Sequence, residues 1–265
     1  MIDASKYGPW AVIAGGSEGV GSEFALQLAD AGINSVLIAR KPGPLEETAE
    51  TVRAKGVEVR TLALDLTQAE ARQTIIEQTQ DLDVGLFIYN AGANTYGHDF
   101  ITGDLTRFRE VVDLNITAQL ELTQHFGKVL ADRGRGGMIL VGSMAGFSGS
   151  AQISVYAAAK AFARIFAEGL WVELREKNVD VLDLILGVTR TPAMARAGLN
   201  MDIPGMHVSE PADVARQGLE NLGKTPTKIA EGNEKGVEAR QGPNREQILL
   251  AAHEASKKLL PPQSE

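Results

Sequence analysis

The stretch AGGSEGVGSEFA, residues 14–25, contains four glycines between an apolar run and a helical pattern. The apolar run covers residues 10–14, and three of the glycines follow the spacing Gly15-x-x-x-Gly19-x-Gly21. Such a strand-to-helix turn lets a phosphate group approach backbone N–H groups at a helix N-terminus, where the helix dipole favours an anion. A tight turn without any ligand is the alternative interpretation, so other parts of the chain have to decide between the two.

Short apolar runs rich in valine, isoleucine and leucine alternate with longer helical patterns along most of the chain. The runs cover residues 10–14, 35–39, 58–63, 84–89, 137–141 and 179–185. The helical patterns cover residues 21–31, 45–55, 69–80, 105–133 and 155–177. Strands that are buried on both faces read as continuous apolar runs, and crossover helices connect them when they are parallel. The pattern therefore predicts an α/β doubly wound fold, with a mostly parallel seven-stranded sheet flanked by helices.

Length and composition limit the class of protein. The chain has 265 residues, of which 44% are hydrophobic and 23% charged, as in an ordinary globular protein. We expect one domain over residues 1–265. A net charge of -8 argues against nucleic-acid binding, which needs clustered lysine and arginine. The chain has no cysteine, and no apolar stretch suits a membrane span or a signal peptide, so we expect a cytoplasmic protein with no membrane partner.

The last third of the chain is less regular. Residues 191–211 contain prolines, methionines and glycines without clear periodicity, and we expect them to form a mobile lid over a substrate. Ser209 is a candidate N-cap for a helix that follows it. A polar, glycine-containing stretch at residues 223–244 precedes a helical pattern at residues 245–260, and we expect residues 261–265 to be disordered.

The glycine turn resembles that of the short-chain dehydrogenase/reductase family, which reads Thr-Gly-x-x-x-Gly-x-Gly, with Ala14 in place of the threonine. Further motifs extend the resemblance to about Thr191. Tyr89-Asn90-Ala91-Gly92 is similar to the family's Asn-Asn-Ala-Gly, and Asp65-Leu66 is similar to the pair that faces adenine. The segment Leu186-Gly187-Val188-Thr189-Arg190-Thr191 is similar to Pro-Gly-x-x-x-Thr, which holds the nicotinamide carboxamide. The resemblance implies a single-domain Rossmann fold that binds a nicotinamide dinucleotide. The residues it assigns to cofactor binding are Gly15, Ser17, Glu18, Gly19, Val20, Gly21, Asp65, Leu66, Asn90, Ala91, Gly92, Tyr156, Lys160, Gly187, Thr189 and Thr191.

Tyr156 and Lys160 form the sharpest local signal for catalysis. They are spaced so that both side chains lie on one face of a helix. A phenol has a pKa of about 10, so it exchanges protons poorly near neutrality unless a nearby cation favours its ionised form. An isolated pair of this kind is more often a surface tyrosine and lysine on an alanine-rich helix.

The family resemblance favours the catalytic interpretation of this pair. It assigns Ser143 and Asn115 to the same catalytic tetrad, in the order that the family shows. It implies that Tyr156 protonates the substrate oxygen, that Ser143 hydrogen-bonds this oxygen, and that Lys160 lowers the pKa of Tyr156 and holds the nicotinamide ribose. Asn115 would fix a water in a proton path to Lys160. The four histidines have no metal-ligand spacing, so no metal is expected.

The choice of cofactor depends on Arg40. In dinucleotide folds an acidic residue about twenty positions beyond the glycine turn binds the ribose of NAD, whereas an arginine accommodates the 2′-phosphate of NADP. The second apolar run ends at Ala39, followed by Arg40 and Lys41, with no carboxylate. We therefore expect NADP(H) to be preferred, with NAD(H) as the alternative. The competing interpretation is that both cations face solvent, and Glu18 inside the turn weighs against the phosphate.

The expected function is hydride transfer between nicotinamide and a carbonyl or secondary alcohol. A catalytically silent dinucleotide sensor or a scaffold is the alternative. The family also implies a homodimer or homotetramer formed through the helices at residues 105–133 and 155–177. An apolar pocket for a bulky small-molecule substrate is expected from side chains in the variable segments: Ala93, Phe100, Met144, Phe147, Ile153, Met194 and Met206.

Overall fold

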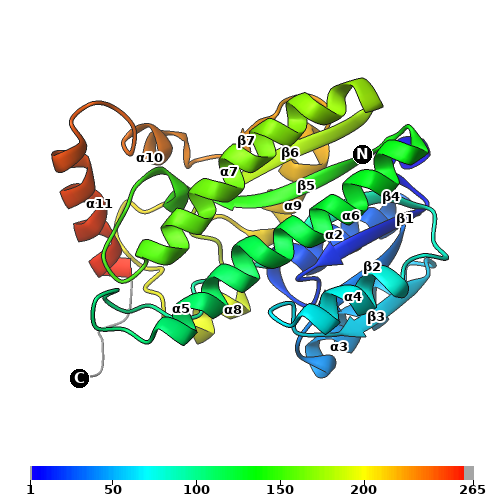
Figure 1. The fold of residues 1–265 in the computed structure, drawn as a ribbon, viewed down its shortest axis with the longest axis horizontal. Coiled ribbons are helices and arrows are strands. Elements are labelled where there is room, and N and C mark those ends of the chain that lie inside the picture. The colour runs from blue at the N-terminus through cyan, green and yellow to red at the C-terminus, as the bar shows by residue number, and fades with distance from the viewer. Residues whose placement is uncertain (1, 260–265) are drawn as a thin grey trace.

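The fold is built on one seven-stranded sheet, and the computed structural model describes residues 2–259 (Figure 1). The strand order is β3-β2-β1-β4-β5-β6-β7, and every neighbouring pair is parallel. The doubly wound α/β prediction is thereby confirmed. The strands are β1 Trp10–Ala14, β2 Asn34–Ala39, β3 Val59–Ala63, β4 Val84–Tyr89, β5 Gly136–Ser143, β6 Val179–Leu186 and β7 Thr227–Ile229.

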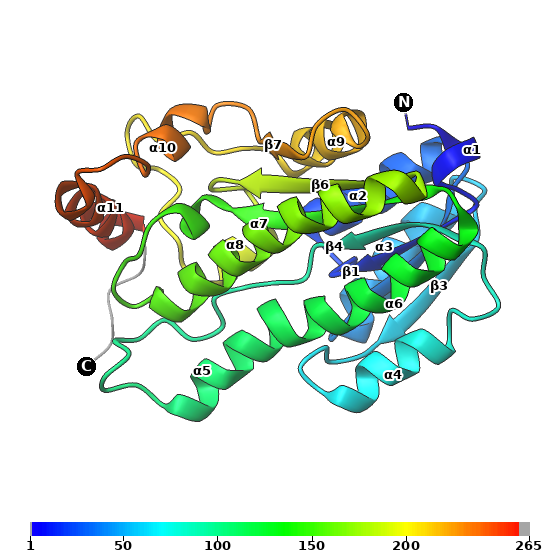
Figure 2. The same ribbon diagram turned by 45° about the horizontal axis from the view of Figure 1, so that its top comes forward.

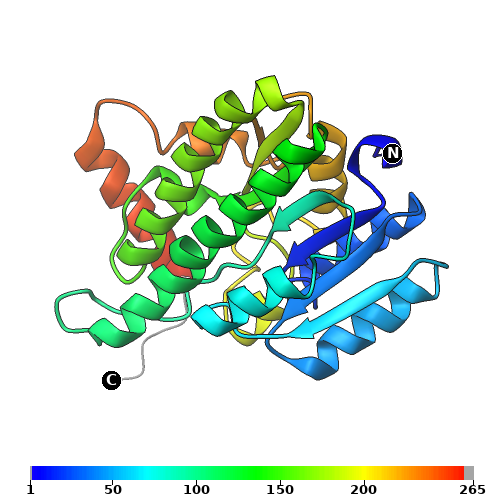
Figure 3. The ribbon, with the colours of Figure 1, turned by 45° about the vertical axis from the view of Figure 1, so that its right-hand side comes forward.

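Helices cover both faces of the sheet and bury a separate apolar layer on each (Figures 2 and 3). One layer lies under α2 Gly19–Asp30, α3 Pro42–Arg53 and α9 Pro211–Asn221. The other lies under α4 Ala69–Glu77, α6 Ala118–Arg133 and α7 Ser154–Leu174. A short helix, α1 Ala4–Tyr7, precedes β1. No helix among residues 2–259 has the length and apolar character that crossing a membrane requires.

The long helix expected at residues 105–133 is interrupted in the middle. It consists of α5 Leu105–Val112, a π-helical turn at Asp113–Thr117, and α6. The cause lies at Asn115, whose side-chain amide Nδ2 donates to the carbonyl of Val111 at 2.9 Å. A side chain that enters the helical hydrogen-bond ladder widens the turn. The interruption therefore follows from the position of one buried amide.

The segment after β6 contains elements that the sequence did not define. They are α8 Pro192–Arg196, β7 and α10 Glu234–Glu238. The helical pattern predicted at residues 245–260 forms α11 Arg245–Leu259. Ser209 was predicted to be the N-cap of α9, but Glu210 occupies that position. Instead, Ser209 is extended and its N–H donates to the carbonyl of Val188 at 2.9 Å. The predicted end of the last helix at residue 260 and the predicted disorder of residues 261–265 lie outside the described residues.

The glycine turn lies where the order of strands reverses, between β1 and β4. Gly15 has a φ of +83°, and a Cβ there would lie 2.8 Å from the backbone nitrogen of Ala91. A Cβ at Gly21 would lie 1.9 Å from the carbonyl oxygen of Gly15. Asn90 joins the two sides, because its Nδ2 donates to that same carbonyl at 2.9 Å. The turn can therefore approach the end of β4 only because these positions lack side chains. Ligands of doubly wound folds bind in the crevice at this reversal point.

A carboxylate is buried between the sheet and α7. Asp183 on β6 has no exposed surface, and neither of its side-chain oxygens has a hydrogen-bond partner among the described residues. Gly142 on β5 leaves room for it, since a Cβ there would lie 2.6 Å from Oδ1 of Asp183. Burial raises the pKa of Asp183 to about 7, although Lys160 and Arg164 act to lower it. The native state thus resists ionising this group.

The raised pKa of Asp183 predicts how stability changes with pH. Above about pH 4 the unfolded carboxyl loses its proton, whereas the native one keeps its proton up to about pH 7, so stability falls through this window by up to about 1.4 kcal/mol per pH unit. Asp183→Asn removes that slope. In urea unfolding, the free energy of unfolding of the variant minus that of the wild type should be higher at pH 7.5 than at pH 5, by more than about 1 kcal/mol.

The exposed Asp202 on the loop after α8 provides the control. Asp202→Asn removes an exposed carboxylate and leaves the buried Asp183 in place. The difference between its free energy of unfolding and that of the wild type should therefore be the same at the two pH values. A constant difference for Asp183→Asn as well would show that the buried carboxyl does not titrate in this window.

Candidate active site

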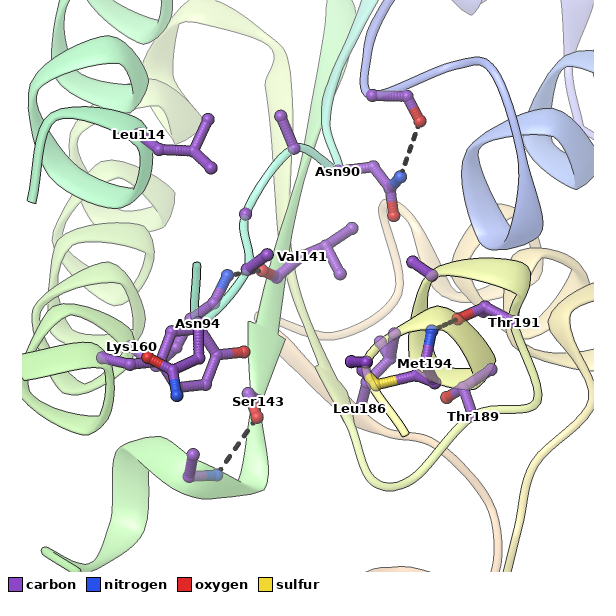
Figure 4. A pocket seen from close by; sticks show the side chains of 18 of the residues that line it. Asn90, Asn94, Leu114, Val141, Ser143, Lys160, Leu186, Thr189, Thr191 and Met194 are labelled. Carbon is purple, nitrogen blue, oxygen red and sulfur yellow. Dashed lines mark hydrogen bonds between the residues drawn. The ribbon is translucent and has the colours of Figure 1, made fainter. Parts of the chain in front are cut away.

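A cavity of about 820 Å³ opens along the carboxyl ends of the strands. It begins at the glycine turn, passes Asn90 and Gly92 after β4, and reaches Tyr156 and Lys160 on α7. Figure 4 shows Lys160 and Ser143 on one side of this pocket and Thr191 on the other. The site therefore joins the end of β1, where an anion can bind, to a group of titratable side chains.

The first turns of α7 carry Tyr156 and Lys160. The Lys160 side chain is buried, and its Nζ donates to the carbonyl of Val141 on β5 at 3.0 Å. The same Nζ lies 5.8 Å from the centre of the Tyr156 ring. Helical spacing thus brings the ammonium group beside the phenol, as the sequence predicts, and the bond to β5 fixes it there.

Burial dominates the acidity of both side chains. It raises the pKa of Tyr156 above its usual value, while a hydrogen bond with Ser143 acts in the opposite direction. It lowers the pKa of Lys160 to about 8, with Asp183 opposing this change. Lys160 was expected to lower the pKa of Tyr156, and the net direction is the reverse because loss of water on burial outweighs the hydrogen bond with Ser143. The phenol is therefore protonated at neutral pH.

Ser143 is the last residue of β5, beyond the predicted end of the strand at residue 141. It pairs with Leu186 of β6, so strand pairing extends past the apolar run. Its Oγ accepts a hydrogen bond from the N–H of Ala145 at 3.2 Å and caps a 3₁₀ turn over Met144–Phe147. The strand and this turn together hold the hydroxyl next to Tyr156.

Asn115 lies in the π-helical turn, close to Lys160 of α7. Its Nδ2 donates to the carbonyls of Ala93 and Val111, whereas its buried Oδ1 has no partner among the described residues. A Cβ added at Gly92 would lie 2.8 Å from this Oδ1 and 2.8 Å from Nζ of Lys160. The two polar atoms therefore flank the same glycine, and the four expected catalytic residues come together in space.

Most of the residues expected to bind the cofactor line the cavity, but three do not. Gly19, Gly21 and Asp65 are not part of its wall, and Oδ1 of Asp65 accepts hydrogen bonds from the N–H and hydroxyl of Thr67. Those in the lining are Gly15, Ser17, Glu18, Val20, Arg40, Lys41, Leu66, Asn90, Ala91, Gly92, Tyr156, Lys160, Gly187, Thr189 and Thr191. The glycine-lined crevice and this polar set fit a dinucleotide.

The turn after β6 is held by contacts that the sequence did not reveal. A Cβ at Gly187 would lie 1.8 Å from Oδ1 of Asn233, so this glycine is needed for close packing. Thr189 is buried and donates to the carbonyl of Gly187 at 3.3 Å. The Thr191 hydroxyl accepts a hydrogen bond from Met194 N–H at 3.2 Å and caps α8 (Figure 4). This bond uses one of the two lone pairs of the hydroxyl oxygen, and the hydroxyl proton is available to a ligand.

Charge near the glycine turn is arranged unevenly. Arg40 and Lys41 are exposed at the end of β2, line the cavity, and form no ion pair among residues 2–259. Glu18, by contrast, is paired with Arg196 of α8, with Nη1 of the arginine 2.9 Å from Oε2. The carboxylate inside the turn is therefore compensated, while the two cations at the end of β2 are not.

The other end of the cavity differs in part from the expected apolar pocket. Ala93, Met144, Ile153 and Met194 line it as expected. Phe100, Phe147 and Met206 do not: Phe100 packs against Phe108 with ring centres 5.2 Å apart, and the Arg164 guanidinium lies 4.7 Å from the centre of the Phe147 ring. Polar and C-terminal side chains that no sequence motif indicated complete the lining: Asn94, Ser150, Gln152, Arg240, Ala252, Ser256 and Leu259.

The chain matches the family model described as short chain dehydrogenase over residues 9–202. It is 33% identical over 226 residues to the 7beta-hydroxysteroid dehydrogenase of Clostridium sardiniense, covering 85% of this chain and 86% of the relative. It is 32% identical over 222 residues to the very-long-chain 3-oxoacyl-CoA reductase of Podospora anserina, covering 82% of this chain and 65% of the relative.

A solved structure shares the fold throughout. It was determined to study the stereoselectivity of a 7beta-hydroxysteroid dehydrogenase, and it superposes with a TM-score of 0.86 at 27% identity, covering 95% of this chain and 99% of that one. These similarities agree with the family resemblance of the glycine turn and of Tyr156 and Lys160, which line the same cavity. The chain therefore belongs to the short-chain dehydrogenase/reductase family and is an oxidoreductase that transfers hydride between a nicotinamide dinucleotide and hydroxyl or keto groups.

Proposed function

We propose that this protein is an NADP(H)-dependent oxidoreductase that interconverts a ketone and a secondary alcohol on a bulky, largely apolar small molecule. The observation that carries the proposal is the position of Tyr156, whose protonated phenol and neighbouring Ser143 share one cavity with the glycine turn. The chemical classes named for the relatives, hydroxysteroid and 3-oxoacyl, are bulky and apolar and support the same choice.

Tyr156 is the proposed general acid of the reducing direction. A bound nicotinamide would supply the hydride to the carbonyl carbon, and the developing alkoxide needs a proton. Burial raises the pKa of Tyr156, so the phenol holds that proton at neutral pH. Ser143 donates a hydrogen bond to the same oxygen and orients it. A positioned acid of this kind contributes about 10²–10⁴-fold to the rate. In the oxidising direction the phenol receives the proton instead.

Lys160 and Asn115 are proposed to return the proton to Tyr156. The pKa of Lys160 is about 8, so the amine can both hold and release a proton near neutral pH. The unpartnered Oδ1 of Asn115 flanks Gly92 together with Nζ of Lys160. One water between these two atoms would satisfy both of them. We infer that Asn115 positions this water and that Lys160 also contacts the nicotinamide ribose.

Replacing Tyr156 by Phe tests the proposed general acid. The variant should lose about 10²–10⁴-fold in kcat, while the Kd for NADPH stays within about twofold, because the hydroxyl acts on the substrate oxygen. Reduction of a panel of bulky ketones is followed at the nicotinamide absorbance. Tyr96→Phe is the matched control, since Tyr96 is not part of the cavity wall.

Two results would contradict this assignment. Substantial kcat in folded Tyr156→Phe would exclude the phenol as the acid. Tight binding of NADPH by the wild type without reduction of any ketone would instead favour a dinucleotide sensor or scaffold.

NADP(H) is the proposed cofactor because Arg40 and Lys41 have no partner of opposite charge among residues 2–259 and line the cavity. A guanidinium group forms charge-assisted hydrogen bonds with phosphate, each worth roughly 1.5–3 kcal/mol. Glu18 would repel a phosphate, but its ion pair with Arg196 reduces that repulsion. The balance of charge therefore favours the 2′-phosphate.

Arg40→Asp tests the proposed cofactor choice. The ratio of kcat/KM for NADPH to that for NADH should exceed one in the wild type and fall by about 10–100-fold in the variant. Arg135→Asp, an exposed change at the opposite end of the sheet, should leave the ratio unchanged. A wild type that prefers NADH, or a variant with the wild-type ratio, would show that Arg40 does not read the phosphate.

Self-association through α5, α6 and α7 is also proposed. Leu105, Leu120, Ile165 and Val172 are exposed apolar side chains on these helices, and exposed apolar faces often mark interfaces. A homodimer or homotetramer would cover them. The mobility of residues 191–211 and the cytoplasmic location stay predictions of the sequence.

A further inference from the structure

Arg240 follows α10 and faces the end of the cavity that lies away from the glycine turn. Its guanidinium is partly buried, and Nη1 donates to the carbonyl of Gly236 at 2.6 Å. A Cβ added at Gly236 would lie 3.6 Å from this Nη1 and 2.5 Å from Cε of Met144. Met144 directly follows Ser143, so a short path along the cavity wall connects Arg240 to the proposed reacting oxygen.

No carboxylate pairs with Arg240 among residues 2–259. The other poorly exposed arginines differ, because Arg72 is paired with Glu121 and Arg133 with Asp83. Burial lowers the pKa of Arg240, and no acidic group opposes this effect. An unpaired guanidinium that has lost part of its water is costly, and an anionic ligand would offset the cost.

Arg240 lies on the opposite side of the site from the residues proposed to read the cofactor phosphate. Arg40 follows β2, Ser143 ends β5, and Arg240 comes after β7 at the far edge of the sheet. α10 and α11 lie together at that end of the molecule (Figures 1 and 2). Arg240 is thus placed beside the substrate rather than beside the adenosine end of a dinucleotide.

We propose that Arg240 is an anion-binding residue of the substrate site, which selects elongated ketones or alcohols whose far end carries a carboxylate, sulfonate or phosphate. This inference rests on the proposed function. The guanidinium has a planar fork of donors, one of which is used by Gly236, and the remaining donors suit the oxygens of such a group. Ser150 and Gln152 before α7 and Ser256 on α11 line the same cavity and have polar groups that can contact a ligand.

Two matched pairs of compounds distinguish the possible sources of the anion. The first pair is a 7-ketosteroid with a side-chain carboxylate and its methyl ester. The second pair is a 3-oxoacyl-CoA and the corresponding N-acetylcysteamine thioester, which lacks the phosphates. Reduction is measured with NADPH, and binding to the NADPH-loaded protein is measured by calorimetry at low temperature. The pair that binds identifies the source, and the difference between the carboxylate and its methyl ester measures the role of charge.

Arg240→Met is the decisive variant, because methionine keeps an elongated side chain and removes the charge. For the anionic member of a pair, KM and Kd should rise by about tenfold or more, and kcat should change by less than about twofold. The neutral member should be unaffected, and Arg240→Lys should retain part of the preference. Lys235→Met, on the exposed face of α10, controls for a general loss of positive charge.

The outcomes separate this inference from the proposed function. Reduction of ketones with equal KM for both members of each pair, or an equal loss for both in Arg240→Met, would overturn the anion site and leave the oxidoreductase standing. Binding that prefers the anion and needs Arg240, without oxidation of NADPH, would support the site and contradict the activity. Absence of both binding and turnover for all four compounds would overturn the anion site as well.

Discussion

Contact between two stretches of bare backbone organises this molecule. The α-carbon of Gly21 lies against the carbonyl of Gly15, and Gly15 lies against the backbone after β4. Any side chain at these positions would push α2 away from the sheet and open the crevice between β1 and β4. Because the crevice stays narrow and lined by backbone, a dinucleotide phosphate can reach N–H groups that larger residues would cover. Tyr156 and Lys160 on α7 can act together with a bound dinucleotide because they line the same cavity as this crevice.

The catalytic end of the site keeps polar groups in an apolar surrounding. Lys160 is buried and bonded to a strand carbonyl, Asn115 keeps an unpartnered oxygen, and Asp183 has no hydrogen-bond partner among the described residues. Each of these groups would be more stable in water. Burial of Tyr156 raises the pKa of its phenol, and burial of Lys160 lowers the pKa of its amine to about 8, which brings the ionisation of the lysine towards the neutral range. The protein thus gives up stability where proton transfer requires poised groups.

The sequence predicted the parts of the fold that depend on local patterns. Apolar runs identified six strands, and the glycine spacing and the pair formed by Tyr156 and Lys160 located the site. A seven-stranded sheet was predicted, but the position of the seventh strand was not, because β7 is three residues long and lies at an edge where few apolar residues are needed. The extension of β5 to Ser143 depends on pairing with β6, which no local pattern contains.

The rest of the site depends on contacts between distant segments. Arg240 and Asp183 acquire their roles only when α10 and α7 fold over the sheet, and neither lies in a motif. The helical pattern at residues 245–260 gave no sign that α11 would close the cavity. Asp65 and Phe100 were expected to face a ligand, but neither is part of the cavity wall. Asp65 accepts a hydrogen bond from Thr67, and Phe100 packs against Phe108, contacts that no sequence motif indicates.

The proposed reaction depends on direct passage of hydride from nicotinamide to a carbonyl carbon held beside Tyr156. The most direct measurement uses NADPH carrying deuterium on one face of nicotinamide C4 and a bulky ketone, with the alcohol product analysed by mass spectrometry and NMR. Direct transfer places one deuterium on the carbinol carbon from one of the two labelled epimers, and none from the other or from deuterated water. Consumption of NADPH without deuterium at that carbon from either epimer would contradict it.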